Sequence, residues 1–295
     1  MFIEIFLMAV KDSTKTYCLY CKKILSDPKE IKLQYHISCK NELEDFEKED
    51  KGKIGFLSKA LSLPESQIVK LLDNGDIKYT LDKNSNITKL HINSAIYVNG
   101  KGLITDIFNQ THLPTTELQE LQVLSICFGY DWNHVDGWWK SDFKDLQENI
   151  GELKKLEILR LSGNSITALP ESIGDLINLR ELYLDGNDLK NLPKSISKLV
   201  NLEKLNLTDN SLSLPSEMSS LGNLKSLRID EDQINSFVKI SNNLTNLEEL
   251  IIHPEFTQRI FWEHKEKSFK NLPDSVQICF KELKSKGCCI KLYTN

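Results

Sequence analysis

The apolar residues between positions 156 and 229 follow one pattern that returns after 23, 23 and 22 residues. The four copies begin at Leu156, Leu179, Leu202 and Leu224. Leucine or isoleucine stands three and five positions after each start, and this alternation predicts a short β-strand with its apolar side chains on one face. In the first three copies a Leu-Pro pair and an apolar-x-x-Leu segment follow, which predicts that the chain returns through a short helix or turn.

An asparagine follows each of the first three predicted strands, at Asn164, Asn187 and Asn210. Its side-chain amide both donates and accepts hydrogen bonds, so we expect it to satisfy backbone groups of the turn inside a stack. A single copy cannot bury its own apolar face, whereas stacked neighbours bury it between them. The sequence therefore predicts a solenoid built from these copies.

This pattern resembles the leucine-rich repeat family, and its LPxxIxxL half is similar to the intracellular Ras-group and bacterial members of that family. The resemblance implies an α/β fold. It is a solenoid with parallel strands on its concave face and short helices or turns on its convex face. We expect a small zinc finger to precede the solenoid.

The zinc finger is predicted from two short-spaced pairs, Cys18-x2-Cys21 and His36-x2-Cys39, that are separated by fourteen residues. Such pairs suit a tetrahedral Zn²⁺ ion, and the segment resembles a treble-clef finger, similar to one half of a LIM-type module. Four protein ligands leave no open coordination position, so we expect one structural Zn²⁺. The alternatives are a small reduced core of coincidentally spaced residues and redox chemistry at the first pair.

Segments outside the regular copies predict further coils and caps. Ile87–Ile92 and Leu121–Ile126 fit the strand pattern at longer spacing, so we interpret them as degenerate coils with insertions. Asp76–Leu81 alternates as well and is expected to form a hairpin with Ile87–Ile92. The other predicted elements are a helix at Pro64–Leu72, a helix at Ser275–Lys286 and a final strand at Cys288–Tyr293.

These elements divide the chain into five parts. They are an N-terminal tail (1–16), a zinc finger with a C-terminal helix (17–50), a linker and N-terminal cap (51–86), the leucine-rich repeats (87–252, degenerate over 87–155 and regular over 156–252) and a C-terminal cap (253–295).

Composition and charge limit the classes of partner and the cellular location that we expect for the protein. The net charge of −5, from 37 basic and 42 acidic residues, gives no global attraction to nucleic acid or to anionic membranes. Seven unevenly placed cysteines do not indicate a secreted disulfide framework. The first ten residues form an apolar segment that is too short to span a bilayer. Met8 is an alternative start to Met1, and a cleaved signal peptide is a second interpretation of this segment. We expect a cytoplasmic protein without membrane insertion.

The residues between the inward leucines are expected to face the concave surface, where a partner would bind. Four of them belong to one predicted central column, namely Arg160, Tyr183, Asn206 and Arg228. Tyrosine and arginine are enriched at binding hot spots. An aromatic insertion at Phe128–Trp139 adds Trp132, Trp138 and Trp139 as candidate contacts at the rim. The alternative for these tryptophans is that they fill the gap between irregular coils.

The mixed charge of the predicted face favours a protein or peptide ligand over a polyanion. The leading hypothesis is therefore a non-enzymatic protein-protein interaction scaffold with a structural zinc finger as a second contact module. No catalytic residues are predicted, because no nucleophile with a matching base is visible. The alternatives are a nucleic-acid-linked regulator that uses the zinc finger and an adaptor in ubiquitin-type ligation.

Overall fold

The computed structural model describes residues 118–127, 143–253 and 272–292 without a gap, and most of 64–93. It also describes positions 16–17, 24–25, 55, 57–58, 97–98, 101–102 and 115. The account below concerns these residues.

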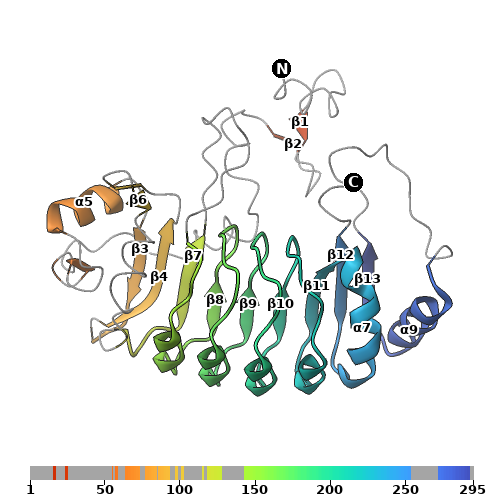
Figure 1. The fold of residues 1–295 in the computed structure, drawn as a ribbon. Coiled ribbons are helices and arrows are strands. Elements are labelled where there is room, and N and C mark those ends of the chain that lie inside the picture. The colour runs from red at the N-terminus through yellow and green to blue at the C-terminus, as the bar shows by residue number, and fades with distance from the viewer. Residues whose placement is uncertain are drawn as a thin grey trace.

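The main element of the fold is a nine-stranded sheet (Figure 1). Its spatial order is β13-β12-β11-β10-β9-β8-β7-β4-β3, and every neighbouring pair is parallel except the antiparallel pair β3 and β4. The strands are β3 (Ile77–Leu81), β4 (Ile87–Asn93), β7 (Val123–Cys127), β8 (Ile158–Arg160), β9 (Glu181–Tyr183), β10 (Lys204–Asn206), β11 (Ser226–Asp230), β12 (Glu249–His253) and β13 (Cys289–Leu292). Sequence order and spatial order coincide, which is the arrangement that the repeat predicts.

The returning segments form short helices, as predicted. Four 3₁₀ helices follow one another along the molecule: η2 (Glu148–Glu152), η3 (Glu171–Asp175), η4 (Lys194–Lys198) and η5 (Ser216–Ser220). In the last three, the repeat proline is the N-cap residue and holds an extended backbone, so the chain turns sharply into the helix. Successive helices lie against one another, and Figure 1 shows them in a row along one side of the sheet.

The fourth regular coil departs from this pattern because it lacks the proline. Asp230 and Gln233 form a capping box there, and the chain continues through η6 (Glu231–Gln233), α7 (Ile234–Ile240) and η7 (Ser241–Asn243). Ile234, Phe237 and Ile240 point into the core. A true α-helix therefore replaces the 3₁₀ turn, which the repeat pattern did not predict.

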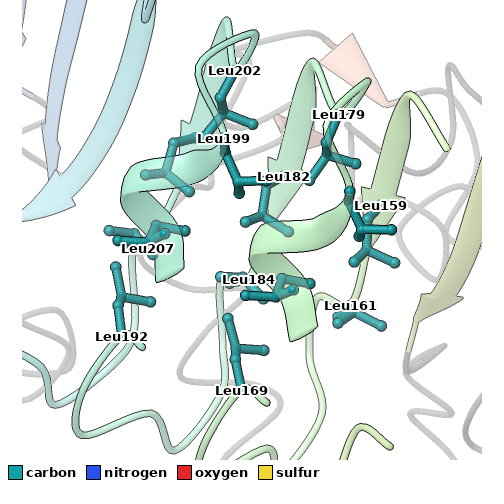
Figure 2. Close-up of a cluster of buried hydrophobic side chains, with 14 of the residues drawn as sticks. Leu159, Leu161, Leu169, Leu179, Leu182, Leu184, Leu192, Leu199, Leu202 and Leu207 are labelled. Atoms are coloured by element: carbon teal, nitrogen blue, oxygen red, sulfur yellow. The ribbon is translucent and has the colours of Figure 1, made fainter. Parts of the chain in front are cut away.

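The core consists of the repeat leucines and isoleucines, stacked coil on coil. Leu182 and Leu184 of β9 and the segment after it are completely buried, and their equivalents in neighbouring coils are buried as well. Figure 2 shows such leucines from three adjacent coils facing one another across the interior. Each buried side chain contributes roughly 1.5–3 kcal/mol of gross stabilisation, and each depends on the next coil for its cover.

A ladder of buried asparagine amides joins the turns that follow the strands. The Asn187 Nδ2 donates to the carbonyl oxygens of Leu184 at 2.8 Å and of Leu161, in the preceding coil, at 2.9 Å. The Asn187 Oδ1 accepts from the backbone N–H of Ile166 at 3.1 Å. Asn164 and Asn210 donate in the same way, which confirms the predicted role of this position.

Gln233 takes this place in the fourth coil. Its Nε2 donates to the Leu212 carbonyl oxygen at 3.2 Å, and Ser236 Oγ accepts from the Leu214 N–H at 3.1 Å. A second, exposed ladder runs outside the core, where Asn178, Asn201, Asn223 and Asn246 each donate to a carbonyl oxygen of the preceding coil. The coils also approach closely at Gly174, because a Cβ atom there would lie 2.4 Å from the Ser195 carbonyl oxygen.

The ends of the sheet agree with the predicted elements. The helix α5 spans Glu65–Asp73, and the hairpin is β3 with β4. At the other end α9 spans Asp274–Ser285, and β13 extends the sheet in parallel with β12. Cys288 is buried and Cys289 is exposed, so these adjacent thiols lie on opposite sides as expected, and both are free. None of the helices found in the described segments is long and apolar enough to cross a bilayer.

Two small strand pairs lie outside the main sheet. β1 (Thr16–Tyr17) pairs antiparallel with β2 (Ile24–Leu25), and β5 (Tyr97–Val98) pairs antiparallel with β6 (Lys101–Gly102).

The buried ladder makes a testable prediction about stability. We expect Asn187→Ala to lower the free energy of unfolding by about 2–4 kcal/mol, because the buried Ile166 N–H loses its acceptor. The carbonyl oxygens of Leu161 and Leu184 each lose one of two amide donors as well. The matched control Asn178→Ala removes one exposed hydrogen bond and is expected to cost less than about 1 kcal/mol. Urea unfolding of both variants measures the difference, and equal losses would contradict the buried-ladder argument.

Candidate functional site

The face of the sheet that points away from the leucine core, called the concave face below, carries aligned columns of side chains. The strand register places these columns in the predicted order. The central column runs His91, Ser125, Arg160, Tyr183, Asn206, Arg228, Ile251 and Lys291. The column before it runs Lys89, Val123, Ile158, Glu181, Lys204, Ser226, Glu249 and Cys289.

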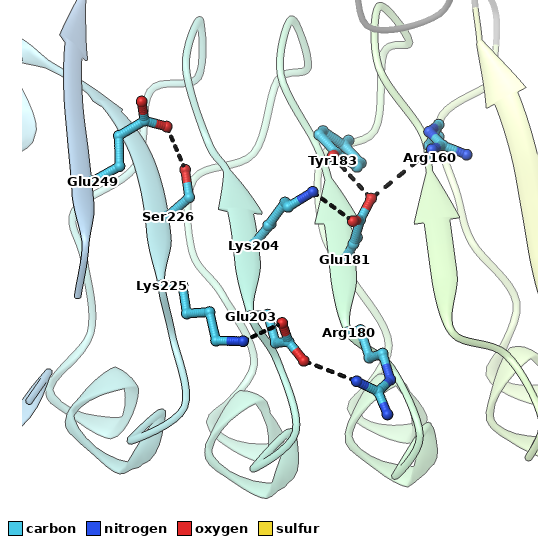
Figure 3. A network of polar contacts seen from close by, with 9 residues as sticks. All are labelled: Arg160, Arg180, Glu181, Tyr183, Glu203, Lys204, Lys225, Ser226 and Glu249. Atoms are coloured by element: carbon cyan, nitrogen blue, oxygen red, sulfur yellow. Dashed lines mark hydrogen bonds and ion pairs between the residues drawn. The ribbon is translucent and has the colours of Figure 1, made fainter. Parts of the chain in front are cut away.

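One carboxylate organises the middle of this face, and we call its surroundings the Glu181 cluster, which comprises Arg160, Glu181, Tyr183 and Lys204. The Lys204 Nζ lies 2.7 Å from Glu181 Oε1. The Tyr183 hydroxyl donates to Glu181 Oε2 at 3.0 Å, and an Arg160 guanidinium nitrogen lies 3.9 Å from the same oxygen. Figure 3 shows these three side chains converging on Glu181 from strands β8, β9 and β10.

Arg160 is the buried member of the cluster. Its side chain is 8% exposed, whereas that of Lys204 is 50% exposed. The guanidinium also lies over the Tyr183 ring, 5.4 Å from its centroid, so the cation and the aromatic face attract each other. Arg160 therefore fixes Tyr183 and Glu181 in place. Solvent reaches Lys204 and, to a smaller extent, Tyr183 and Glu181.

Asn206 is also buried, at 6% exposure, and belongs to a hydrogen-bonded chain at the carboxyl ends of the strands. Its Nδ2 donates to Asp185 Oδ1 at 2.9 Å, and Ser162 Oγ donates to the same oxygen at 2.8 Å. The Thr208 hydroxyl donates to Asn206 Oδ1 at 3.0 Å. Because the amide is engaged on both sides, Asn206 holds neighbouring coils in register.

A second carboxylate repeats the arrangement three strands away, and we call its surroundings the Glu249 cluster, which comprises Ser226, Arg228, Glu249 and Lys291. The Lys291 Nζ lies 2.5 Å from Glu249 Oε1, and Ser226 Oγ donates to Oε2 at 3.0 Å. Burial alone would raise the pKa of the Glu249 carboxyl. The hydrogen bonds from Lys291 and Ser226, together with the charges of Lys291 and Arg228, outweigh burial and lower that pKa.

A third polar group lies at the N-terminal end of the face. His91 Nδ1 lies 2.9 Å from Ser125 Oγ, which is 3.4 Å from Cys127 Sγ, and all three residues are buried. Burial, and then the positive charges of Lys78 and Arg160, lower the pKa of His91 to about 4. The imidazole is therefore neutral at pH 7.

The fold and the repeat decide the family. A model of the leucine-rich repeat region matches residues 137–285, which is half of the chain. The chain belongs to the leucine-rich repeat family. The stacked leucines, the asparagine ladder and the parallel strands described above are the structural features on which that assignment depends.

Solved leucine-rich repeat structures are similar to parts of this chain. A leucine-rich repeat protein of Leptospira interrogans is 24% identical with a TM-score of 0.40, over 62% of this chain and 51% of its own. The ectodomain of a plant membrane receptor kinase from Arabidopsis thaliana is 26% identical with a TM-score of 0.35, over 47% of this chain and 16% of its own. Internalin C2 from Listeria monocytogenes is 18% identical with a TM-score of 0.41, over 70% of this chain and 81% of its own.

This leucine-rich repeat chain thus spans about half of the length of the first of these structures. No curated protein sequence matches it.

The predicted site residues of the repeat face fall into two groups. Tyr183 and Arg228 are partly exposed on the concave face, whereas Arg160 and Asn206 are buried beside them. Glu181, Lys204, Glu249 and Lys291 were not among the predicted site residues. Opposite charges at equivalent positions of neighbouring coils, such as Glu181 and Lys204, were the available signal.

The other predicted site residues lie outside the described residues. They are the zinc ligands Cys18, Cys21, His36 and Cys39 and the tryptophans Trp132, Trp138 and Trp139. Within the segments that the structure does describe, no group of three or more histidine, cysteine or acidic side chains could hold a metal ion. The zinc site therefore stays a prediction from sequence.

The buried His91 predicts a pH dependence of stability. An unfolded histidine titrates near pH 6.5 and the folded one near 4, so the unfolded chain binds more protons between these values. Stability is therefore lost as the pH falls from 6.5 towards 4, by about 2 kcal/mol at pH 5.

We expect His91→Asn to remove this contribution. Urea unfolding of wild type and variant at pH 7 and pH 5 measures it as the difference between the two pH-induced losses, in which carboxylates common to both proteins cancel. Equal losses in the two proteins would show that His91 is not held neutral in the folded state.

Proposed function

We propose that this leucine-rich repeat protein is a non-enzymatic interaction scaffold that binds a protein or peptide partner on its concave face. The observation that supports the proposal is the surface of ordered polar and charged side chains across strands β9 to β13. Tyr183, Lys204, Arg228 and Lys291 reach solvent there. Hydrogen bonds and ion pairs to Glu181 and Glu249 fix the positions of Tyr183, Lys204 and Lys291. A rigid, preformed surface avoids the entropy that ordering a loop would cost on binding.

Within this proposal the four predicted contacts have different roles. Tyr183 and Arg228 are direct contacts, because both reach solvent from the central column. Arg160 acts through Tyr183 and Glu181, which it holds by a cation-π contact and an ion pair. Asn206 acts through its hydrogen bonds with Asp185 and Thr208, which hold these two side chains in place. Substitution of the buried pair is therefore expected to disturb the shape of the face as well as its chemistry.

The proposal keeps Trp132, Trp138 and Trp139 as contacts of the same partner. They follow β7 in the sequence, and β7 ends at Cys127. Aromatic side chains supply large contact areas at low entropic cost, and this makes them suitable anchors.

The proposal also keeps the single structural Zn²⁺ held by Cys18, Cys21, His36 and Cys39. The antiparallel pairing of Tyr17 with Ile24 supports it, because these two residues flank the first two cysteines in the sequence and lie side by side. A tight reversal is what a Cys-x2-Cys pair needs to direct both thiolates at one ion. A cytoplasmic location belongs to the same proposal, since thiols stay reduced there.

A random-sequence linear peptide library displayed on phage tests the concave-face function. We expect selection on the wild-type protein to yield peptides that bind the double variant Lys204→Glu/Arg228→Glu at least about tenfold more weakly, because charge reversal on a contact surface opposes binding. Fluorescence anisotropy with synthetic copies of the selected peptides measures the dissociation constants.

The matched control is Lys194→Glu/Lys239→Glu, which makes the same charge change on η4 and α7. Both lysines are exposed, and residue 171, the equivalent of residue 194 in the preceding coil, is already glutamate. We expect this control to bind like wild type. Peptides that bind both double variants equally, or a library from which none is enriched, would contradict the proposed function.

Elemental analysis of reduced, chelator-free protein tests the metal. We expect about one zinc per chain, and about half a zinc or less would contradict the four-ligand assignment. Cys18→Ser/Cys21→Ser is expected to lose the zinc, whereas Cys289→Ser, which alters an exposed thiol of the last strand, is expected to retain it.

A further inference from the structure

The Glu181 and Glu249 clusters share one design, in which each carboxylate is already saturated from within the protein. One oxygen of each glutamate lies beside a lysine, at 2.7 Å from Lys204 and at 2.5 Å from Lys291. The other oxygen accepts from a hydroxyl at 3.0 Å, from Tyr183 in one cluster and from Ser226 in the other. Neither carboxylate is therefore well placed to receive a further cation from a partner.

The cations of the two clusters outnumber these carboxylates. Arg160 and Lys204 adjoin Glu181, and Arg228 and Lys291 adjoin Glu249, so each cluster carries an excess of one positive charge. This excess stands against the net charge of −5 of the whole chain. The concave face over β10 to β13 thus presents three cations, Lys204, Arg228 and Lys291, on a protein that is negative overall.

The two acidic residues at the carboxyl ends of the strands, Asp185 and Asp230, keep their charge but are engaged by donors of the protein itself. Asp185 Oδ1 accepts hydrogen bonds from Ser162 and Asn206. Asp230 is 4% exposed, and its Oδ2 accepts from the backbone N–H of Asp209 at 2.6 Å. Both carboxylates are directed into the protein's own donors.

Arg228 is a cation of this face, within strands β10 to β13, that is left for a partner. Its guanidinium forms no ion pair or hydrogen bond with any residue that the structure describes, and its influence on Glu249 is purely electrostatic. Lys204 and Lys291 are 50% and 47% exposed, and ion pairs at such exposed positions are weak enough to exchange partners. Arg160 is 8% exposed and lies out of reach.

From this arrangement we propose that the concave face recognises an acidic segment of its partner, with one carboxylate held by Arg228 and further carboxylates placed against Lys204 and Lys291. This inference rests on the proposed function and names the partner's chemistry. A guanidinium presents two parallel N–H donors that match the two oxygens of a carboxylate, so Arg228 fixes the position of the first acid.

The strand spacing limits how the acidic residues are arranged. Neighbouring strands lie about 4.8 Å apart, so β10 and β13 are separated by about 14 Å. An extended chain rises about 3.3 Å per residue, and about four residues therefore span the distance from Lys204 to Lys291. A segment that crosses the strands meets all three cations when its acidic residues are spread over about five positions.

The peptides selected on the wild-type protein provide the probe. We expect Asp and Glu at two or more positions within five residues, at over twice their frequency in the starting library. Arg228→Glu is expected to weaken these peptides by about tenfold or more, whereas Lys239→Glu, on α7 of the same coil, leaves the dissociation constant within about twofold. Replacing one peptide Glu by Lys is expected to restore binding to Arg228→Glu, as a charge swap should.

The outcomes separate this inference from the function on which it rests. Peptides that lose affinity for Lys204→Glu/Arg228→Glu but show no acidic enrichment, or that bind Arg228→Glu as tightly as wild type, overturn the acidic-segment proposal and leave the concave-face function standing. The absence of any peptide that depends on the concave face overturns both. Circular dichroism and urea unfolding of Arg228→Glu, with Lys239→Glu alongside, distinguish a loss of binding from a loss of fold.

Discussion

The stacking of one coil on the next is the constraint on which the rest of this structure depends. A single coil exposes its leucines on both flat sides, and only the neighbouring coils remove them from water. The turns after the strands have the same dependence, because Asn187 joins carbonyl oxygens of its own coil and of the preceding one. Apolar burial and buried hydrogen bonding therefore fix one spacing between coils, and that spacing sets the separation of every side chain on the concave face.

The concave face follows from this spacing. Side chains at equivalent repeat positions come to lie next to one another, so a glutamate in one coil meets a lysine from the next, as Glu181 meets Lys204 and Glu249 meets Lys291. Exposed ion pairs of this kind add little to stability. Their consequence is geometric, because they pair the glutamates of the face with lysines and leave Arg228 without a close partner among the described residues. Because the coils stack at one spacing, the repeat in the sequence places charged side chains at fixed positions on the concave face.

The repeat made most of the scaffold predictable. The strand order, the register of the columns and the asparagine ladder follow from a period near 23 residues, since equivalent positions must align when coils stack. The terminal hairpin followed from the alternation of apolar residues in its two strands. The α7 helix did not follow from the period, because this coil lacks the proline that precedes the 3₁₀ helix in other coils and has a capping box at Asp230 and Gln233. The burial of Arg160 could not be predicted either. Periodicity determines the face on which a side chain lies, but it does not determine which groups surround the end of that side chain.

The sequence by itself thus determined the family, the solenoid and the list of residues that share the concave face, because these depend on periodicity alone. The tertiary structure decided which of those residues are available to a partner. Arg160 and Asn206 are engaged by Tyr183, Glu181 and Asp185, whereas Lys204, Arg228 and Lys291 reach solvent. The physical reason is that exposure and pairing depend on side chains from neighbouring coils, 21 to 42 residues away along the chain. Their mutual distances are set only when the coils are stacked.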